Sequence, residues 1–182
     1  MLFGHSLVST PFCVYGGIVA ADTESHGALT AAACELAQRL NVDYLEMRNL
    51  KRQHPAWPCK DLYVTFRKKF TDEPEKNLAA IPRKQRAVVR KGIKAGLKAE
   101  IDTDVGRHYA MYSESLRNLG TPVFSRRYLE ILCETFGEDC EVLTISHEDN
   151  PGASCLSFYF RDEVLPYYGG GTFAARAVGG ND

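Results

Sequence analysis

The sequence predicts a mixed α/β fold, of the α+β kind, in which two halves are joined by a basic helix. Three observations favour this class. Apolar residues recur at helical spacing in several segments, most clearly over 28–40 and 126–136. The apolar period changes to two residues in three consecutive segments between residues 141 and 168, which predicts an antiparallel meander. Between the two halves, residues 81–98 carry seven basic side chains and no acidic one.

The composition is typical of a soluble globular protein, with 45% hydrophobic residues, 25% charged residues and a net charge of −1. The charge is uneven: residues 1–80 carry nine basic and nine acidic side chains, whereas residues 99–182 carry six basic and fourteen acidic ones. No apolar run is long enough for a membrane span, and the first residues lack the basic and apolar regions of a signal peptide. We therefore expect a cytoplasmic protein without a transmembrane segment.

Cysteine and histidine show no metal-ligand spacing in this chain. The six cysteines are scattered and form no C-x-x-C pair, so we expect buried free thiols rather than a disulfide framework. The five histidines share no local spacing either. No metal site is predicted, because zinc sites are built from closely spaced cysteine or histidine pairs.

The first half, residues 1–80, alternates between strands and a helix. Phe3–Ile18 is expected to be extended, and Ala28–Leu40 carries leucines and alanines at helical spacing. Val42–Met47 predicts a strand, and Tyr63–Phe70 predicts another because its side chains alternate in polarity. Candidates for the N-cap of the helix are Asp22, Thr23 and Ser25.

The second half, residues 99–182, begins with a short strand and two helices. Asp104 is the expected cap of a helix that ends at Gly120, and Ser125 is the expected cap of Arg126–Phe136. The meander follows, with turns predicted at Asn150–Gly152 and Asp162–Glu163, and the chain then enters a glycine loop at 169–171. The predicted strands of this half are Ala99–Asp102, Glu141–Ser146, Ala153–Arg161 and Val164–Tyr168. This order of elements fits the first part of an acyltransferase fold of the GNAT type.

The basic segment 81–98 predicts a helix that starts near Pro82 and ends near Gly96. Its cations recur at spacings of three and four residues, so many of them share one face. We expect a few apolar side chains to contact the rest of the protein, namely Val88, Ile93 and Leu97.

Like charges on one short helix repel one another, so this segment is more favourable beside an anion. Phosphate groups of a nucleotide, a lipid head group or an RNA are natural ligands for such a face. The alternative is a solvated helix that only connects the two halves. The candidate phosphate-binding residues are Arg83, Lys84, Arg86 and Arg90.

Five stretches of the chain resemble the Fem-like (FemAB-related) transferase family, and most closely its branch associated with the exosortase (PEP-CTERM) system of Gram-negative bacteria. The combination of RNLGTPVF with LPYYGG is the more specific part of this resemblance. The matching stretches are LVSTPFCVYGG at Leu7–Gly17, YLEMRN at Tyr44–Asn49, IPRKQRAVVRKG at Ile81–Gly92, RNLGTPVFSRRYLEIL at Arg117–Leu132 and SFYFRDEVLPYYGGGTFAARAVGGND at Ser157–Asp182.

The resemblance implies two fused GNAT-like halves. Residues 1–80 would be the later part of the first half, residues 81–98 the linking helix, and residues 99–182 the earlier part of the second half. Family members continue past the final Asn-Asp of this sequence, so we expect the chain to be a central fragment.

The resemblance also implies an N-acyl transfer. Fem-like enzymes move an amino acid from aminoacyl-tRNA to an amine of a peptidoglycan precursor, and GNAT relatives move an acyl group from acyl-CoA. In both reactions an amine attacks an activated acyl carbon without a covalent enzyme intermediate. This agrees with a sequence that has no Ser-His-Asp or Cys-His arrangement and no Walker-type glycine loop. The branch implies a role in cell-envelope or exopolysaccharide production.

Two tyrosines before the glycine triplet, Tyr167 and Tyr168, are candidates for lining the acceptor cleft. The alternative for both is core packing at a strand end. Glu46 and Arg48 alternate on one predicted strand, which favours a structural ion pair. The sequence assigns no general base and no other catalytic residue.

Two other functional classes stay open. One is a non-catalytic module that binds RNA or another anionic surface through the basic helix, although the acidic second half argues against it. The other is an inactive remnant of a longer transferase, which would expose unpaired sheet edges.

Overall fold

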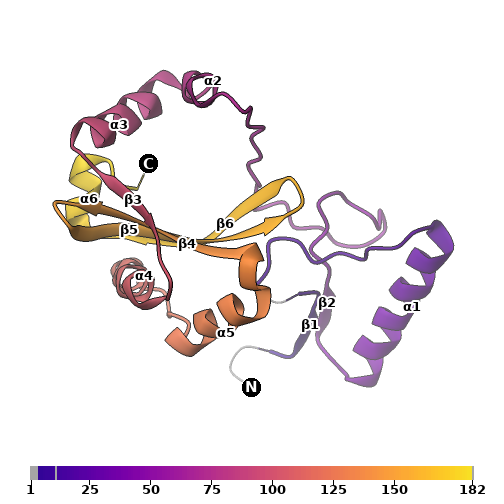
Figure 1. Ribbon diagram of the computed structural model, residues 1–182. Coiled ribbons are helices and arrows are strands. Elements are labelled where there is room, and N and C mark those ends of the chain that lie inside the picture. Colours follow the sequence, from indigo (N-terminus) through magenta and orange to yellow (C-terminus); the bar gives the residue numbers. More distant parts are fainter. Residues whose placement is uncertain (1–3, 11, 182) are drawn as a thin grey trace. The chain divides into compact units, whose positions relative to one another are not determined.

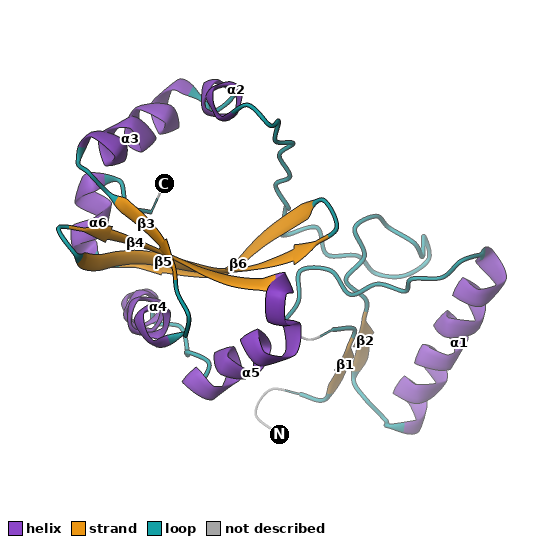
Figure 2. Ribbon diagram, viewed as in Figure 1, coloured by secondary structure: helices purple, strands orange, loops and turns teal. Residues whose placement is uncertain are grey.

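The computed structural model describes residues 4–10 and 12–181 of the chain (Figure 1). It divides into two compact units, with the boundary between Arg67 and Lys68. We call the residues before this boundary unit 1 and those after it unit 2. Both units contain helices and strands (Figure 2), which confirms the mixed α/β class predicted from the sequence.

Unit 1 contains one long helix between two short strands. β1 (Ser6–Val8) pairs in parallel with β2 (Tyr44–Glu46), and α1 (Thr23–Arg39) lies between them in the chain. Asp22 caps α1, because its carboxylate accepts a hydrogen bond of 2.7 Å from the Ser25 N–H. The helix therefore begins five residues earlier than its apolar pattern indicated, since the cap rather than the first leucine sets its start.

The chain after β2 agrees with one prediction and contradicts another. Arg48 Nε lies 2.7 Å from Glu46 Oε1, which confirms the predicted ion pair. Tyr63–Phe70, predicted as a strand, has no strand pairing, and Tyr63 and Phe66 are 94% and 91% exposed. Alternating polarity favours a strand only where a neighbouring strand can take the backbone hydrogen bonds, and here none is paired. Outside the described residues lie Phe3 and Pro11 of the expected N-terminal extended segment.

Unit 2 forms a four-stranded antiparallel sheet in the order β3-β4-β5-β6. Helices α4 and α5 pack on one side of this sheet, while α6 packs against β5 and α3 packs against α6 (Figure 1). In chain order the elements are α2 (Pro74–Ala79), α3 (Arg83–Lys94), β3 (Lys98–Ile101), α4 (Gly106–Leu119), α5 (Arg126–Phe136), the 3-10 turn η1 (Gly137–Asp139), β4 (Cys140–His147), β5 (Asn150–Phe160), β6 (Glu163–Gly171) and α6 (Phe173–Val178).

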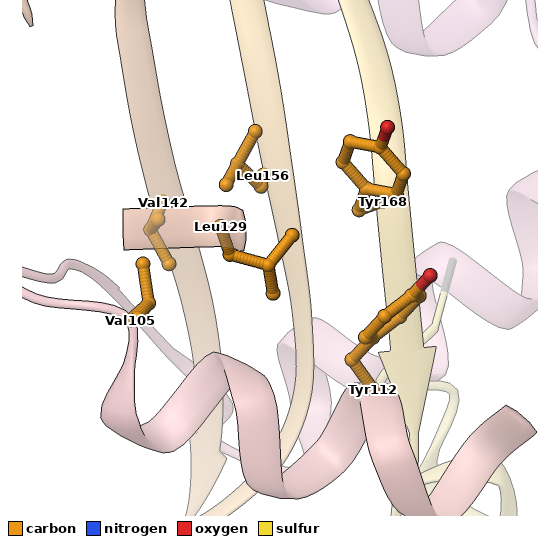
Figure 3. Packing of buried hydrophobic residues seen from close by; sticks show 6 residues of the cluster. All are labelled: Val105, Tyr112, Leu129, Val142, Leu156 and Tyr168. Atoms are coloured by element: carbon orange, nitrogen blue, oxygen red, sulfur yellow. The ribbon is translucent and has the colours of Figure 1, made fainter. Parts of the chain in front are cut away.

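The core of unit 2 lies between the sheet and helices α4 and α5. Figure 3 shows Tyr112 of α4 and Tyr168 of β6 with their side chains on the same side of the sheet as Leu129. Gly170 allows α4 to approach β6 closely, because a Cβ at that position would lie 2.6 Å from Tyr112 Cα. The buried cluster consists of Val105, Tyr112, Leu129, Val142, Leu156 and Tyr168.

Most predicted elements of unit 2 are confirmed. Ser125 caps α5 by accepting a hydrogen bond of 3.2 Å from the Tyr128 N–H, and Gly120 ends α4 with a φ of +70°. The cap of α4 was predicted wrongly. Asp104 accepts from the Gly106 N–H at 2.5 Å, but it stands one residue before the N-cap, Val105, which makes no side-chain capping bond.

The ends of the meander also differ from the predictions. The turn between β4 and β5 is formed by Glu148 and Asp149, both at positive φ, so Asn150–Gly152 belongs to β5 instead. The glycines 169–171 are not a loop: they pair with Ala153–Cys155 as the end of β6, and α6 follows. Small residues can extend a strand where a helix lies against its face, as α4 does at Gly170.

Candidate functional site

Helix α3 is attached to α6 by a close approach of the two backbones. Gly92 is the buried residue of α3, and a Cβ there would lie 3.4 Å from the Gly179 carbonyl oxygen. A Cβ at Gly179 would in turn lie 2.9 Å from the Val88 carbonyl oxygen. Lys91 adds a hydrogen bond of 2.6 Å from Nζ to the Ala177 carbonyl oxygen. These contacts fix the position of α3 on α6, and they use small residues rather than a leucine-rich face.

The apolar side of α3 is therefore smaller than the sequence indicated. Val88 and Leu97 are partly buried, as predicted, but Ile93 is 66% exposed. The buried position next to α6 is occupied by Gly92, where a Cβ would lie 2.9 Å from Leu97 Cδ1 and 3.4 Å from the Gly179 carbonyl oxygen. The prediction for Ile93 was wrong because the contact is made through backbone atoms.

The cations of α3 have no acidic partners in the part of the chain that the structure describes. The other ion pairs of unit 2 join Lys76 to Glu73, Lys98 to Asp149, and Arg107, Arg126 and Arg127 to nearby carboxylates. The α3 cations that form no described ion pair are Arg83, Lys84, Arg86, Arg90, Lys91 and Lys94. Their mutual repulsion is thus not relieved by an ion pair to any described residue of unit 2, which favours an anion at this face.

Five of these cations surround one open hollow on the side of α3. Its volume is about 600 Å³, and it is lined by residues of this helix alone, so it is a surface depression between long side chains rather than an enclosed cavity. Lys84 does not line it. The lining residues are Arg83, Arg86, Ala87, Arg90, Lys91 and Lys94. Three of the four predicted phosphate-binding cations therefore line the hollow, together with two lysines that were not among the candidates.

The two candidate tyrosines lie on β6, away from the contacts of α3. Tyr168 is 8% exposed, and its hydroxyl lies 3.1 Å from the Tyr128 hydroxyl. Burial raises the pKa of Tyr168 far above its ordinary value, and the hydrogen bond to Tyr128 acts in the same direction. Tyr167 is half-buried at an irregularity in the β5–β6 pairing, with its ring 5.8 Å from that of Phe158. Tyr168 thus has a packing role in the core, and Tyr167 is the more accessible of the two.

A string of buried polar side chains crosses the sheet beneath α4. His108 is fully buried, and its Nδ1 lies 3.0 Å from Ser154 Oγ. Ser154 Oγ lies 3.1 Å from Thr144 Oγ1, which is 2.9 Å from Asp102 Oδ2. Arg107 pairs with the carboxylate of Asp102 at the outer end, and this contact raises the pKa of the guanidinium. The string therefore connects a surface ion pair to a buried imidazole.

Proton counting along this string assigns the tautomer of His108. Thr144 has one hydroxyl proton, which goes to the Asp102 carboxylate, so Ser154 must donate to Thr144. Ser154 Oγ then accepts from the Nδ1–H of His108, and the lone pair is left on Nε2. Nε2 is buried and has no hydrogen-bond partner among the described residues. Burial lowers the pKa of His108 to about 4, against a smaller opposite effect of Asp102, so the imidazole is neutral at pH 7.

A family model described as an acetyltransferase (GNAT) domain matches residues 83–182. The match covers more than half of the 182 residues of the chain. The chain belongs to the GNAT acetyltransferase domain family. No curated protein matches the sequence.

The GNAT domain match begins at Arg83, the first residue of α3, and runs through the whole sheet of unit 2. The basic helix is therefore inside the matched region. The family supports an acyltransferase function in general terms, as the order of elements after α3 indicated in the sequence.

Neither a candidate metal centre nor a membrane-spanning helix is found in the described part of this GNAT protein. No group of three histidine, cysteine, aspartate or glutamate side chains there could hold a metal ion. No helix in the same residues is both long and apolar enough to cross a membrane.

Sequence reasoning missed the buried string because each histidine was considered by its local spacing. A signal was present: Thr144, Ser146 and Ser154 lie at inward positions of two predicted strands, where apolar residues are expected. Polar residues on the buried face of a strand need hydrogen-bond partners, and these come from other elements of the fold. The pairing with His108 of α4 joins residues 46 positions apart, which local spacing cannot reveal.

Proposed function

We propose that this GNAT-family chain is a Fem-like acyl- or aminoacyltransferase that transfers an acyl group from a phosphate-bearing donor to an amine. Acyl-CoA and aminoacyl-tRNA are the two donors considered. We also propose a place for the reaction in the cytoplasm and a role in cell-envelope or exopolysaccharide production of the PEP-CTERM type. Within this proposal, residues 1–80 and 99–182 are parts of two GNAT-like halves, with residues 81–98 between them. The Fem-like motifs and the family match over residues 83–182 support this assignment.

The reaction places defined demands on the protein. A neutral amine attacks the acyl carbon, the carbonyl oxygen becomes an oxyanion, and the donor leaves as a thiol or as a ribose hydroxyl. The protein must bind both substrates side by side, accept the amine proton and stabilise the oxyanion. Because no covalent enzyme intermediate is needed, binding of the donor phosphates supplies much of the positioning.

The observation that carries the proposal is the cationic face of α3, whose side chains form no ion pair with the residues that the structure describes. We assign the donor phosphates to Arg83, Lys84, Arg86 and Arg90. Guanidinium groups bind phosphate through two parallel hydrogen bonds, and three of these residues border the same hollow. The contacts of Gly92 and Lys91 with α6 fix the position of this face relative to the sheet.

The acceptor side of the proposal involves β6. We assign Tyr167 to the acceptor cleft because it is half-buried at the irregular part of this strand. Tyr168 contributes to the same cleft by packing, since its ring centroid lies 4.8 Å from that of Tyr167 while its hydroxyl faces Tyr128.

The test is a double charge reversal on α3. The variant Arg86→Glu/Arg90→Glu should bind acetyl-CoA, or an aminoacyl-tRNA, about ten-fold or more weakly, because two charge-assisted contacts become repulsive. Binding would be measured by isothermal titration calorimetry with each donor, and acyl transfer by label incorporation into a lysine-containing peptide.

A matched control separates a specific site from net charge. Lys60 and Lys69 are exposed loop residues with no described ion pair, so Lys60→Glu/Lys69→Glu changes the net charge by the same amount. The control should bind as the unmodified chain does, and circular dichroism should show both variants folded. Equal binding by the α3 variant and the unmodified chain would remove the assigned role of the helix.

RNA binding without catalysis is the second candidate, favoured by the same cations of α3, which form no ion pair among the described residues. It predicts an affinity for RNA that falls steeply as salt rises, with the slope set by the number of phosphates neutralised. Tight, salt-sensitive binding of an uncharged tRNA combined with no acyl transfer from either donor would favour this candidate over the transferase.

A further inference from the structure

Two cysteines of unit 2 hold their sulfur atoms in contact. Cys133 lies in the last turn of α5, and Cys140 is the first residue of β4. Their Sγ atoms are 3.7 Å apart, and Cys140 acts as the donor in this contact. Both residues are partly buried against the hydrophobic core of the unit. All six cysteines of the chain are free thiols, so this contact is an unlinked pair.

The contact is held by ordered structure on both sides. α5 ends at Phe136, and the one-turn segment η1 leads directly into β4. Cys140 pairs with Phe158 of β5, and the Phe158 ring lies 5.0 Å from that of Phe136. The two sulfurs therefore meet because a helix end and a strand start are both fixed on β5. A disulfide has a sulfur–sulfur distance of about 2 Å, so the two sulfurs must move closer together for one to form.

The other cysteines have different surroundings. Cys13 and Cys59 are exposed, and Cys34 is partly buried on α1. Cys155 lies in β5, where its Sγ is 3.7 Å from the Leu156 carbonyl oxygen and 3.7 Å from Ser157 Oγ. No described hydrogen bond joins either sulfur of the contact pair to one of these four thiols, which makes them internal controls.

We propose that Cys133 and Cys140 form a reversible intramolecular disulfide when the protein meets a peroxide. This inference is independent of the proposed transferase function. With hydrogen peroxide, one sulfur is oxidised to a sulfenic acid with release of water. The second thiol then displaces a second water and forms the sulfur–sulfur bond. In total two thiols lose two hydrogens and one peroxide becomes two waters. A small dithiol reverses the step by thiol–disulfide exchange.

The local environment disfavours Cys140 as the first sulfur to react. Burial raises the pKa of Cys140 to about 12, and its hydrogen bond to Cys133 acts in the same direction. Cys140 thus remains a thiol at neutral pH, and its S–H points at the sulfur of Cys133. The thiolate is the form that attacks peroxide, so Cys140 is disfavoured as the attacking sulfur and is assigned the resolving step.

The bond would join the end of α5 to the start of β4. α5 also carries Tyr128, whose hydroxyl contacts that of Tyr168. Closing a short loop restricts the unfolded chain, so the oxidised protein should unfold at a higher temperature, by a few degrees.

Intact mass spectrometry of the full chain gives the primary test. After treatment with hydrogen peroxide and blocking of free thiols, the expected product has lost two hydrogens, and its digest contains one peptide pair linked through Cys133 and Cys140. The variants Cys133→Ser and Cys140→Ser should not form this product, whereas Cys155→Ser should form it as the unmodified chain does.

The same samples distinguish the outcomes that would overturn the proposal. Addition of oxygen atoms at Cys133 without a link to Cys140 would overturn it, as would a link through any of the other four cysteines. A melting temperature unchanged by formation of the link would overturn the expected stabilisation of the oxidised protein. Treatment with a dithiol must restore both the mass and the melting temperature, or the modification is not reversible.

Discussion

Units 1 and 2 differ in how they hold their secondary structure. All nine buried apolar residues of the described chain belong to unit 2. Unit 1 has no buried residue in its described part, and α1, although 17 residues long, buries none. Both units have capped helices and paired strands. The difference shows that caps and strand pairing can specify elements locally, whereas only unit 2 adds a core that makes them depend on one another.

This contrast has a consequence for the location of stability. In unit 2 the core residues come from α4, α5, β4, β5 and β6, so removing one of them affects five elements. In unit 1 the apolar side chains of α1 and β2 remain partly exposed, as Leu29 at 48% and Tyr44 at 54% illustrate. Pairs of matched substitutions, one in each unit, can therefore test the comparison directly.

The largest effect is expected for truncation of a core leucine. Leu129 is fully buried, so Leu129→Ala should lower the free energy of unfolding of unit 2 by about 3–4 kcal/mol, through lost burial and a residual cavity. Leu29→Ala, on exposed α1, should change stability by less than about 1 kcal/mol. Urea unfolding followed by circular dichroism, with hydrogen exchange to separate the units, measures both. Equal losses would show that unit 1 has packing comparable to that of unit 2.

Acid should destabilise unit 2 through His108. Its pKa is about 4 in the folded chain and about 6.5 when unfolded, so the unfolded state binds the proton more readily between these values. The stability that the neutral form of His108 contributes is fully present above pH 6.5 and is lost as the pH falls toward 4. The loss reaches about 3 kcal/mol, with a slope near 1.4 kcal/mol per pH unit around pH 5.

The control for this pH effect is His108→Gln, which removes the titrating group. Its free energy of unfolding should be lower at pH 7, because the buried string loses its hydrogen bond to Ser154, but its slope between pH 6.5 and 5 should be smaller. Unfolding curves at several pH values give both quantities. An unchanged slope would assign the acid sensitivity to other groups and would leave His108 without this role.

The next effect concerns a buried hydroxyl. Tyr168→Phe removes the hydrogen bond to Tyr128 and should reduce the stability of unit 2 by about 1–2 kcal/mol. Tyr44→Phe is the matched change in unit 1, and it should stay within about 0.5 kcal/mol because Tyr44 is 54% exposed. If Tyr168→Phe were neutral while acyl transfer failed, Tyr168 would be a catalytic residue rather than a packing residue.

Sequence reasoning worked best where one local signal decides the structure. Ser125 set the start of α5, and the period of two predicted the meander. It failed where the structure is determined by contacts between backbone atoms or by residues that are far apart in the sequence. Three features depend on elements that meet only after folding. They are the packing of Gly92 of α3 against α6, the packing of Gly170 of β6 against α4, and the hydrogen-bonded string from Asp102 to His108. Tyr63–Phe70 shows the opposite error: its side chains alternate as in a strand, but the segment has no neighbouring strand to pair with.

Some features of the candidate site were likewise visible in the sequence, whereas others depend on the fold. The basic residues of α3 were visible in the sequence because they are close together and lack acidic neighbours. That these residues form no ion pair with the described part of the chain was not visible, since the acidic residues of 99–182 could have neutralised them. Tyr168 was indistinguishable from Tyr167 by position, and only the packing of α4 and α5 on β6 separates the two.

The smallest effects are expected at the helix caps, and here the comparison of the units is sharpest. Ser125→Ala removes the cap of α5, and because α5 supports the core, the loss of about 1 kcal/mol should appear in the global unfolding of unit 2. Asp22→Ala removes the cap of α1 in the same way. Since α1 buries no residue, its fraying is not coupled to a core, and the change should appear only as faster hydrogen exchange of the first turns of α1. Hydrogen exchange at single-residue resolution distinguishes the two results. A global shift from Asp22→Ala would mean that α1 unfolds together with the rest of the protein, and the contrast between the units would then be one of exposure alone.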